Sequence, residues 1–158
     1  MLPRFQHILI PVDFSTKTRA ALDVAVEMAA VNHSRVTLLH VVEPIEVGGS
    51  VDTELDEFYK QLGANAVAEL DYLSQRFDGL PCDVQCRTEF GKRVSTIVKF
   101  IERRNVDLVI LSSHRLDTSQ PVRSLASVSY QVGILAPCAV LMVKTEQTGQ
   151  SAAAGESS

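Results

Sequence analysis

The sequence predicts an α/β fold: a single doubly wound parallel sheet of five strands, with helices on both faces. Two patterns in the chain predict it. Short apolar, β-branched runs alternate with longer segments whose apolar residues recur every three or four positions, and this alternation is typical of βαβ units. The run Val36–Val42 is apolar almost throughout, as expected of a strand covered on both faces. We expect right-handed crossovers and the flavodoxin-like, or Rossmann-like, strand order 3-2-1-4-5.

The first half of the chain should form two strands and two helices. His7–Val12 is a short apolar run and is expected to be the first strand, with Val36–Val42 as the second. The helix between them should begin near Ser15, whose hydroxyl can accept from an unpaired backbone N–H, and end at Asn32. A long helix is expected from about residue 52 to 77. Its apolar stripe consists of Leu55, Tyr59, Leu62, Ala66, Leu70, Leu73 and Phe77.

The second half should add three strands and two helices. Cys82–Phe90 alternates loosely and is expected to be an edge strand, Val106–Leu111 a buried strand and Ala139–Val143 the last strand. Gly91 should open the helix that follows the third strand. Apolar residues at helical spacing mark the two helices: Val94, Ile97, Val98 and Ile101 in one, and Leu125, Val128, Val132 and Leu135 in the other.

One domain should account for residues 1–144. The remainder, residues 145–158, contains glutamine, glycine, serine and an alanine triplet without an apolar period. Such a segment cannot bury enough apolar surface to fold, so we expect a disordered tail.

Composition excludes several classes of protein. The net charge is -4, from 15 basic and 19 acidic residues, and no basic stripe favours a nucleic acid partner. The longest apolar run, Ile134–Val143, contains Pro137 and is too short to span a bilayer. The N-terminus lacks the apolar segment of a signal peptide. We therefore expect a cytoplasmic protein with no membrane or nucleic acid partner.

The chain has 3 cysteines, and an odd number argues against a disulfide framework. Cys82 and Cys86 are separated by three residues rather than the two of a redox or zinc pair. A structural role is the main interpretation, with redox-sensitive thiols or metal ligands as alternatives. Cys138 is expected to be a small buried filler.

In the predicted strand order, ligands bind where the carboxyl ends of the first and fourth strands meet. Pro11, Val12 and Asp13 end the first strand, and a loop from Ser112 to Arg115 should follow the fourth. Asp13 suits three roles: a ligand contact, a helix-cap acceptor or a metal ligand. Ser113 beside His114 suggests a nucleophile and its base, but adjacent residues rarely achieve that geometry and no third group is evident. We therefore predict no catalytic residue.

Four segments, in order, resemble the first, second, fourth and fifth strands of the universal stress protein family. They are Ile8–Ser15, Leu38–Glu43, Asp107–His114 and Ala136–Val143, and the resemblance covers residues 5–144. It implies the fold described above. In members that bind ATP, it implies that Asp13 contacts the ribose or adenine and that the backbone of Val41 meets adenine. We therefore predict ATP or another adenine nucleotide as the ligand, with or without magnesium.

The loop after the fourth strand resembles the family's phosphate loop, G-x2-G-x9-G-[ST]. Ser112, Arg115 and Ala126 stand in place of its three glycines, and the spacer has one extra residue. Backbone N–H groups that hold a phosphate need a close approach and often a positive φ, which strains a residue such as Arg115. Its guanidinium could instead pair with a phosphate.

Two interpretations of this loop stay open, a phosphate site supported by serine hydroxyls and a simple polar turn. The candidate site consists of Pro11, Val12, Asp13, Val41, Ser112, Ser113, His114, Arg115, Ala126, Ser127 and Val128. His40 lies in an apolar strand and is expected to be a hydrogen-bonded core histidine.

The last strand, Ala139–Val143, should lie at a sheet edge and carries no charge before Lys144. An exposed apolar edge invites pairing, and the family resemblance implies dimers through this strand. We expect an isologous homodimer; coverage of the edge by the tail is the alternative.

The leading functional hypothesis is a homodimeric, cytoplasmic stress-response protein that binds an adenine nucleotide rather than turning it over. One alternative is an enzyme, a slow ATP hydrolase or phosphotransferase that uses Asp13. The other is a regulatory subunit of a transporter or kinase, with an unknown protein partner and no nucleotide.

Overall fold

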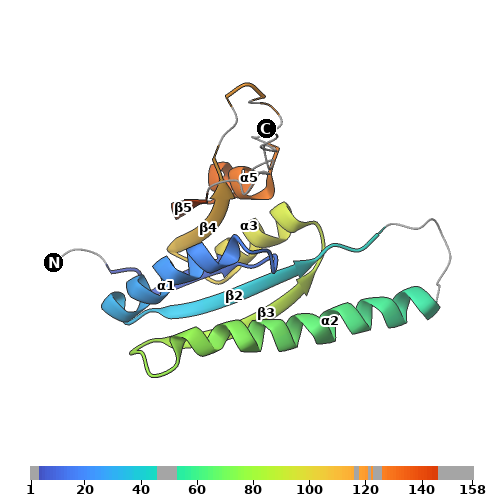
Figure 1. Cartoon of the computed structure of the whole chain (residues 1–158), viewed down its shortest axis with the longest axis horizontal. Helices are drawn as coiled ribbons and strands as arrows, with labels where there is room; N and C mark the ends of the chain where they lie inside the picture. The colour runs from blue at the N-terminus through green and yellow to red at the C-terminus, as the bar shows by residue number, and fades with distance from the viewer. Residues whose placement is uncertain (1–3, 46–52, 116–117, 121, 123–125, 146–158) are drawn as a thin grey trace, which may run out of the picture.

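The computed structural model describes residues 4–45, 53–115, 118–120, 122 and 126–145. Within them a parallel five-stranded sheet has the order β3-β2-β1-β4-β5, as predicted (Figure 1). Its strands are β1 His7–Pro11, β2 Arg35–Val42, β3 Asp83–Phe90, β4 Leu108–His114 and β5 Ala139–Thr145. The helices are α1 Thr18–Asn32, α2 Thr53–Ser74 with the 3₁₀ turn η1 Gln75–Phe77, α3 Arg93–Arg103 and α5 Val128–Leu135.

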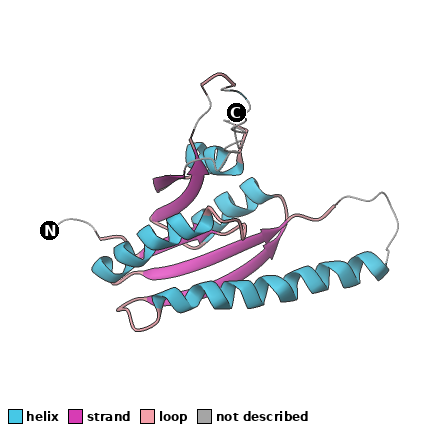
Figure 2. Ribbon diagram, in the orientation of Figure 1, coloured by secondary structure: helices cyan, strands magenta, loops and turns pink. Residues whose placement is uncertain are grey.

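Helices cover both faces of the sheet, as predicted (Figure 2). α1 and α2 pack on one face, over a cluster that includes Ile8, Ile10 and Leu38. α3 and α5 pack on the other face, over a cluster that includes Leu9 and Leu39. Consecutive residues of a strand point to opposite faces, and all five of these side chains are 0% exposed. The centre of the sheet is therefore buried on both sides.

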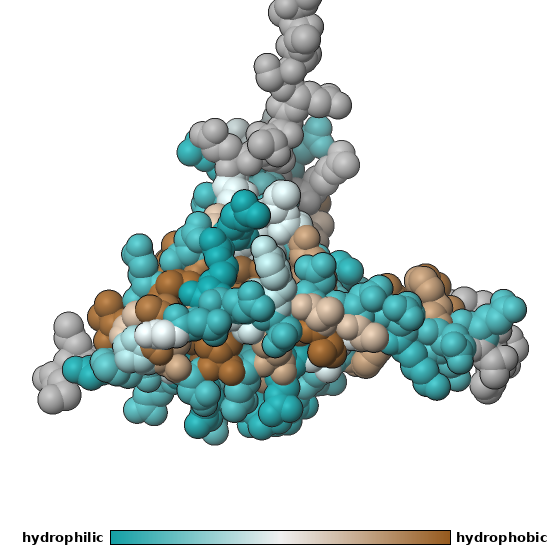
Figure 3. Space-filling model, turned by 60° about the horizontal axis from the view of Figure 1, so that its bottom comes forward, coloured by the Kyte–Doolittle hydropathy of each residue, from teal (hydrophilic) through white to brown (hydrophobic). Residues whose placement is uncertain are grey.

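The predicted apolar stripe of the long helix is confirmed toward its C-terminal end, whereas Leu55, Tyr59, Leu62 and Leu73 are only half-buried. Ala66, Leu70 and Phe77 are buried against the sheet, and the last turn tightens into the 3₁₀ geometry of η1. The N-terminal half of α2 extends past the strands (Figure 1). The surface of this part of the molecule is largely hydrophilic in the space-filling view (Figure 3). Phe58 and Tyr72 of α2 are exposed. Isolated exposed aromatic residues of this kind are ordinary on a soluble domain. No helix among the described residues is long and apolar enough to cross a membrane.

The expected loop at Ser112 was wrong, because β4 continues through His114. Ser112–His114 is paired residue by residue with Val143–Thr145 of β5. Ladder pairing with a neighbouring strand satisfies backbone groups whatever the side chain, so the polar residues do not end the strand. β5 likewise runs beyond the predicted Ala139–Val143 and includes Thr145, which was assigned to the tail. Residues 146–158 lie outside the described part of the chain.

Two helix predictions also need correction. Ser15 is not the cap of α1, which begins only at Thr18; the Asp13 carboxylate accepts from both of these residues instead. Leu135 was expected in the core, but it is 57% exposed, whereas Val132 is 0% exposed. α5 is short, so only part of one face reaches the sheet. Leu125 lies outside the described residues.

The three cysteines are free thiols. Cys86 donates to the Leu70 carbonyl (3.5 Å), and Cys82 packs against the α1/α2-side cluster. Partial desolvation raises the pKa of all three thiols, which disfavours the reactive thiolate, although Cys86 itself is exposed. Cys138 is half-buried rather than fully buried. In the part of the chain that the structure describes, no His, Cys, Asp or Glu side chains gather in a metal-binding group.

A buried histidine ties the start of the central strand to the turn before β4. His7 Nδ1 faces the Arg104 carbonyl at 3.1 Å and its Nε2 faces the Thr37 hydroxyl at 2.8 Å. Because a carbonyl only accepts, Nδ1 carries the proton and the Thr37 hydroxyl donates to Nε2. The Asp107 carboxylate accepts from the backbone N–H groups of Gln6 (2.7 Å) and His7 (2.9 Å). Burial lowers the pKa of His7 from its ordinary 6.5, against the opposing effect of the Arg104 carbonyl.

This lowered pKa predicts acid sensitivity. In the unfolded chain His7 takes up a proton below about pH 6.5, whereas the folded protein resists it, so stability falls as pH drops toward the folded pKa. The contribution is fully present above the unfolded value. Chemical unfolding between about pH 7.5 and about pH 5.5 should show this loss, and His7→Gln should flatten the slope. The control is His33→Asn, an exposed position with φ 53° that asparagine tolerates. An unchanged slope in His7→Gln would refute the assignment.

Candidate functional site

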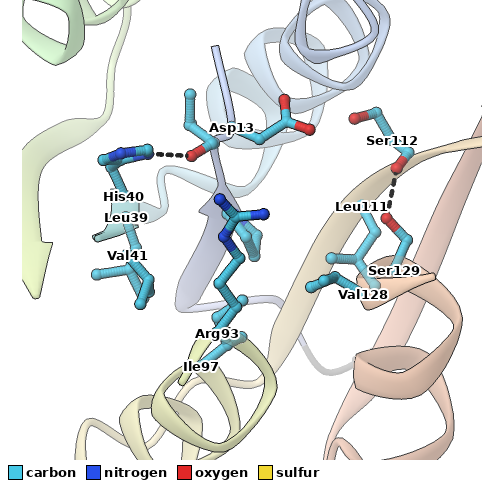
Figure 4. A pocket seen from close by; sticks show the side chains of 12 residues that line it. Asp13, Leu39, His40, Val41, Arg93, Ile97, Leu111, Ser112, Val128 and Ser129 are labelled. Atoms are coloured by element: carbon cyan, nitrogen blue, oxygen red, sulfur yellow. Dashed lines mark hydrogen bonds between the residues drawn. The ribbon is translucent and has the colours of Figure 1, made fainter. Parts of the chain in front are cut away.

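A pocket lies at the carboxyl ends of β1, β2 and β4, on the side of the sheet covered by α3 and α5 (Figure 4). This is the switch point of the sheet, because the chain leaves β1 toward β2 on one side and reaches β4 on the other. The pocket is lined by Pro11, Val12, Asp13, Leu39, His40, Val41, Arg93, Ile97, Leu111, Ser112, Val128 and Ser129.

The floor of the pocket is apolar and its charges are few. Val41, Ile97 and Leu111 are each buried, and the charged lining residues are Asp13 and Arg93. Figure 4 shows the Arg93 guanidinium reaching from α3 into the space between the ends of β1 and β4. The pocket holds about 90 Å³ of space open to water, well below the roughly 300–1,000 Å³ of a site for a drug-sized ligand. It suits a flat ring, with the rest of a larger ligand outside.

Asp13 stands at the rim of the pocket, directly after β1. Its Oδ1 accepts from the Ser15 backbone N–H (2.9 Å) and the Thr18 hydroxyl (3.1 Å). Partial burial opposes ionisation, but these hydrogen bonds outweigh it and hold the pKa of Asp13 below its ordinary value. The carboxylate is therefore ionised at neutral pH. It ties the turn after β1 to the first residue of α1, and its second oxygen is chemically suited to accept from a ligand hydroxyl.

The turn after Asp13 is strained. Phe14 has φ 61°, a left-handed conformation that costs a bulky residue about 1–3 kcal/mol. Its ring lies 4.3 Å from the ring of His40, whose Nδ1 donates to the Val12 carbonyl at 2.7 Å (Figure 4). His40 is thus hydrogen-bonded, as expected, but half-buried beside the pocket rather than in the core. The stacked pair holds the turn that presents Asp13.

On the other side of the pocket, β4 is fastened to α5. The Ser129 hydroxyl donates to the Ser112 carbonyl (2.7 Å), and Ser127 caps α5 by accepting from the Tyr130 N–H (3.4 Å). The Ser113 hydroxyl donates to the His114 carbonyl (3.2 Å). Tyr130 also donates to that carbonyl (3.0 Å).

The structure brings together only part of the predicted site. The predicted residues that line the pocket are Pro11, Val12, Asp13, Val41, Ser112 and Val128. Those that do not line it are Ser113, His114, Arg115, Ala126 and Ser127. Ser113 is buried within β4, and Ser127 serves as the helix cap.

The sequence did not predict six of the residues that line the pocket: Leu39, His40, Arg93, Ile97, Leu111 and Ser129. Most are strand or helix residues without a motif, and only contact across the sheet identifies them. Arg93 carried a weak signal. It follows Gly91 at the carboxyl end of a parallel strand, the edge where ligands bind in this fold class.

The family model described as Universal stress protein family matches residues 4–144. Universal stress protein A of Yersinia pestis is 30% identical over 113 residues, which cover 70% of this chain and 75% of that protein. Universal stress protein A homolog 1 of Coxiella burnetii is 26% identical over 116 residues, covering 70% of this chain and 77% of that protein.

Solved structures share the fold. The universal stress protein UspA from Lactobacillus plantarum has a TM-score of 0.78 at 24% identity, covering 90% of this chain and 99% of that one. A universal stress protein in complex with cAMP has a TM-score of 0.68 at 20% identity, covering 90% and 98%. One from Archaeoglobus fulgidus in complex with dAMP has a TM-score of 0.60 at 18% identity, covering 90% and 100%. By its match over residues 4–144 and its relatives, the chain belongs to the universal stress protein family.

Proposed function

We propose that this protein is a cytoplasmic stress-response protein that binds an adenine nucleotide at the switch-point pocket and acts through binding rather than turnover. One observation carries the proposal: an apolar pocket sized for a flat ring, with an ionised carboxylate, Asp13, at its rim. Two proteins of the same fold are in complex with cAMP and dAMP. Their ligands guide the choice of adenine nucleotides for the test.

Each part of the pocket suits one part of such a ligand. The adenine ring would lie on the apolar floor beside Val41, and the Asp13 carboxylate would accept from a ribose hydroxyl. Ser112 and Ser129 lie on the opposite wall. Mg²⁺ is usually held by one or two protein carboxylates together with the phosphates of a substrate. The lining offers one carboxylate, Asp13, so magnesium would enter together with the phosphates of the nucleotide.

The chemistry of the pocket favours binding over catalysis. Hydrolysis of a phosphate needs a base or a metal to place the water. The acidic lining residue is Asp13, whose pKa is lowered rather than raised, and a carboxylate with a lowered pKa is a weak base. A slow ATP hydrolase at the same site is the alternative, and release of phosphate from ATP would establish it.

A thermal-shift titration with ATP, ADP, AMP and cAMP, each with and without magnesium, tests the proposal. A ligand at about a hundred times its dissociation constant should add roughly 2.7 kcal/mol of stability. We expect a saturable increase in the melting temperature with at least one nucleotide. No shift with any nucleotide would reject nucleotide binding and leave a regulatory protein that acts through protein partners.

Variants of Asp13 separate its two roles. Asp13→Ala removes both the charge and the hydrogen bonds to Ser15 and Thr18, and should lower the unfolding free energy by about 1–3 kcal/mol as well as abolishing the nucleotide-induced shift. Asp13→Asn keeps an acceptor oxygen for Ser15 and Thr18, so it should stay nearly as stable yet bind more weakly. Thr18→Val is the matched control, since it removes one bond to Asp13 and leaves the carboxylate. If Asp13→Asn kept full affinity for the nucleotide, the negative charge of Asp13 would not contribute to binding.

We further propose an isologous homodimer formed through β5, which lies at one edge of the sheet. Light scattering should then give twice the chain mass of 17.3 kDa. Consecutive residues of an edge strand point their N–H groups alternately inward and outward. Val140 and Leu141 are consecutive in β5, so only one of their N–H groups donates to β4. Proline at that position should destabilise the sheet, whereas proline at the other position removes only the outward N–H donor and should give a folded monomer. A monomeric mass for the unmodified protein would contradict the dimer.

A further inference from the structure

Arg93 lies where two hollows meet. The first is the switch-point pocket. The second lies between α3 and α5, and its lining includes Lys92, Ser95, Lys99 and Gln131. Arg93 and Val128 line both, so the two spaces adjoin. The second hollow is much larger, about 780 Å³ against about 90 Å³, and offers the room outside the pocket that a nucleotide needs.

The two hollows differ in chemistry. The pocket floor is apolar, whereas the hollow between α3 and α5 is lined by three cations, Lys92, Arg93 and Lys99, and two carboxylates, Glu43 and Glu102. A ligand with a flat uncharged end and an anionic end would fit the pair of spaces. Its ring would occupy the pocket and its anion would emerge beside Arg93.

Among the residues that the structure describes, Arg93 forms one long ion pair, with Glu43. Its Nε lies 4.0 Å from Glu43 Oε2, and the two side chains are 50% and 48% exposed. An ion pair this long and exposed contributes little, so an incoming anion can displace it. Arg93 is also the first residue of α3, where the helix dipole disfavours a positive side chain. A bound anion would relieve that repulsion.

The end of β4, where the phosphate loop was expected to begin, does not have the shape of a phosphate-binding loop. Ser112–His114 is extended and paired with β5 over its whole length. Those residues form a strand rather than a loop wrapped around a phosphate. The fork of N–H donors on Arg93 can instead bind two oxygens of one phosphate.

We propose that Arg93 holds the phosphate of the bound nucleotide at the junction of the two hollows, and so makes the site selective for nucleotides over nucleosides. The inference rests on the proposed function and deepens it. Arg93 is the specificity-determining residue, and Glu43 is its competitor. The ligand class is a nucleoside monophosphate, with room for further phosphates along Lys92 and Lys99.

Titration calorimetry with AMP and with uncharged adenosine tests the inference on four proteins: unmodified, Arg93→Gln, Glu43→Gln and Arg87→Gln. Loss of a charge-assisted, forked contact should weaken AMP binding by roughly tenfold to a hundredfold in Arg93→Gln, with adenosine affinity unchanged. Glu43→Gln should tighten AMP binding, because it removes a competing anion. Arg87→Gln, at an exposed arginine of β3 outside both hollows, should match the unmodified protein.

The outcomes distinguish the two proposals. If the unmodified protein binds neither AMP nor adenosine, the proposed function fails and this inference fails with it. If it binds them and Arg93→Gln leaves AMP affinity unchanged, or weakens both ligands equally, only the inference fails. Arg93→Lys, which keeps the charge without the fork, should recover part of the AMP affinity. Loss of AMP selectivity in Arg93→Gln together with tighter binding in Glu43→Gln would establish it.

Discussion

The structure depends on the burial of β1 between β2 and β4. Ile8, Leu9 and Ile10 are fully enclosed, so both faces of this strand contribute to the core and its polar groups need partners inside the protein. His7 and Asp107 supply them at its start, through bonds to the α3–β4 turn and to the backbone. The neutral state of His7 is therefore part of the fold at the start of β1.

The same central position of β1 creates the site. A strand with parallel neighbours on both sides leaves a crevice at its carboxyl end where the connections diverge, and here the chain must turn sharply to enter α1. Phe14 accepts a strained φ there, and stacking on His40 offsets the strain. The turn fixes Asp13, whose bonds to Ser15 and Thr18 tie the turn to α1 and keep the carboxylate ionised. Asp13 therefore both stabilises the turn into α1 and lines the candidate binding site.

Apolar and charged residues lie in different parts of the site. A ring and an anion would therefore be recognised in different places. Apolar strand residues form the floor, while cations gather on α3 and along the hollow toward α5. Arg93 joins the two regions and is only weakly paired with Glu43. Selectivity in such a site would depend on one exposed charged side chain on a helix and not on glycines in a loop.

Local patterns in the sequence determined the strands, the helices and the place of Asp13, because periodicity and strand-end position are properties of short segments. The strand order followed from the alternation of strands and helices along the whole chain. Tertiary structure decided what depends on a neighbour. β4 continues through polar Ser112–His114 because β5 lies beside it, and Leu135 is exposed because α5 is short. Arg93 and Asp13 line one pocket although 80 positions separate them in the sequence. No local pattern encodes that arrangement, since it arises only when the sheet aligns the carboxyl ends of its strands.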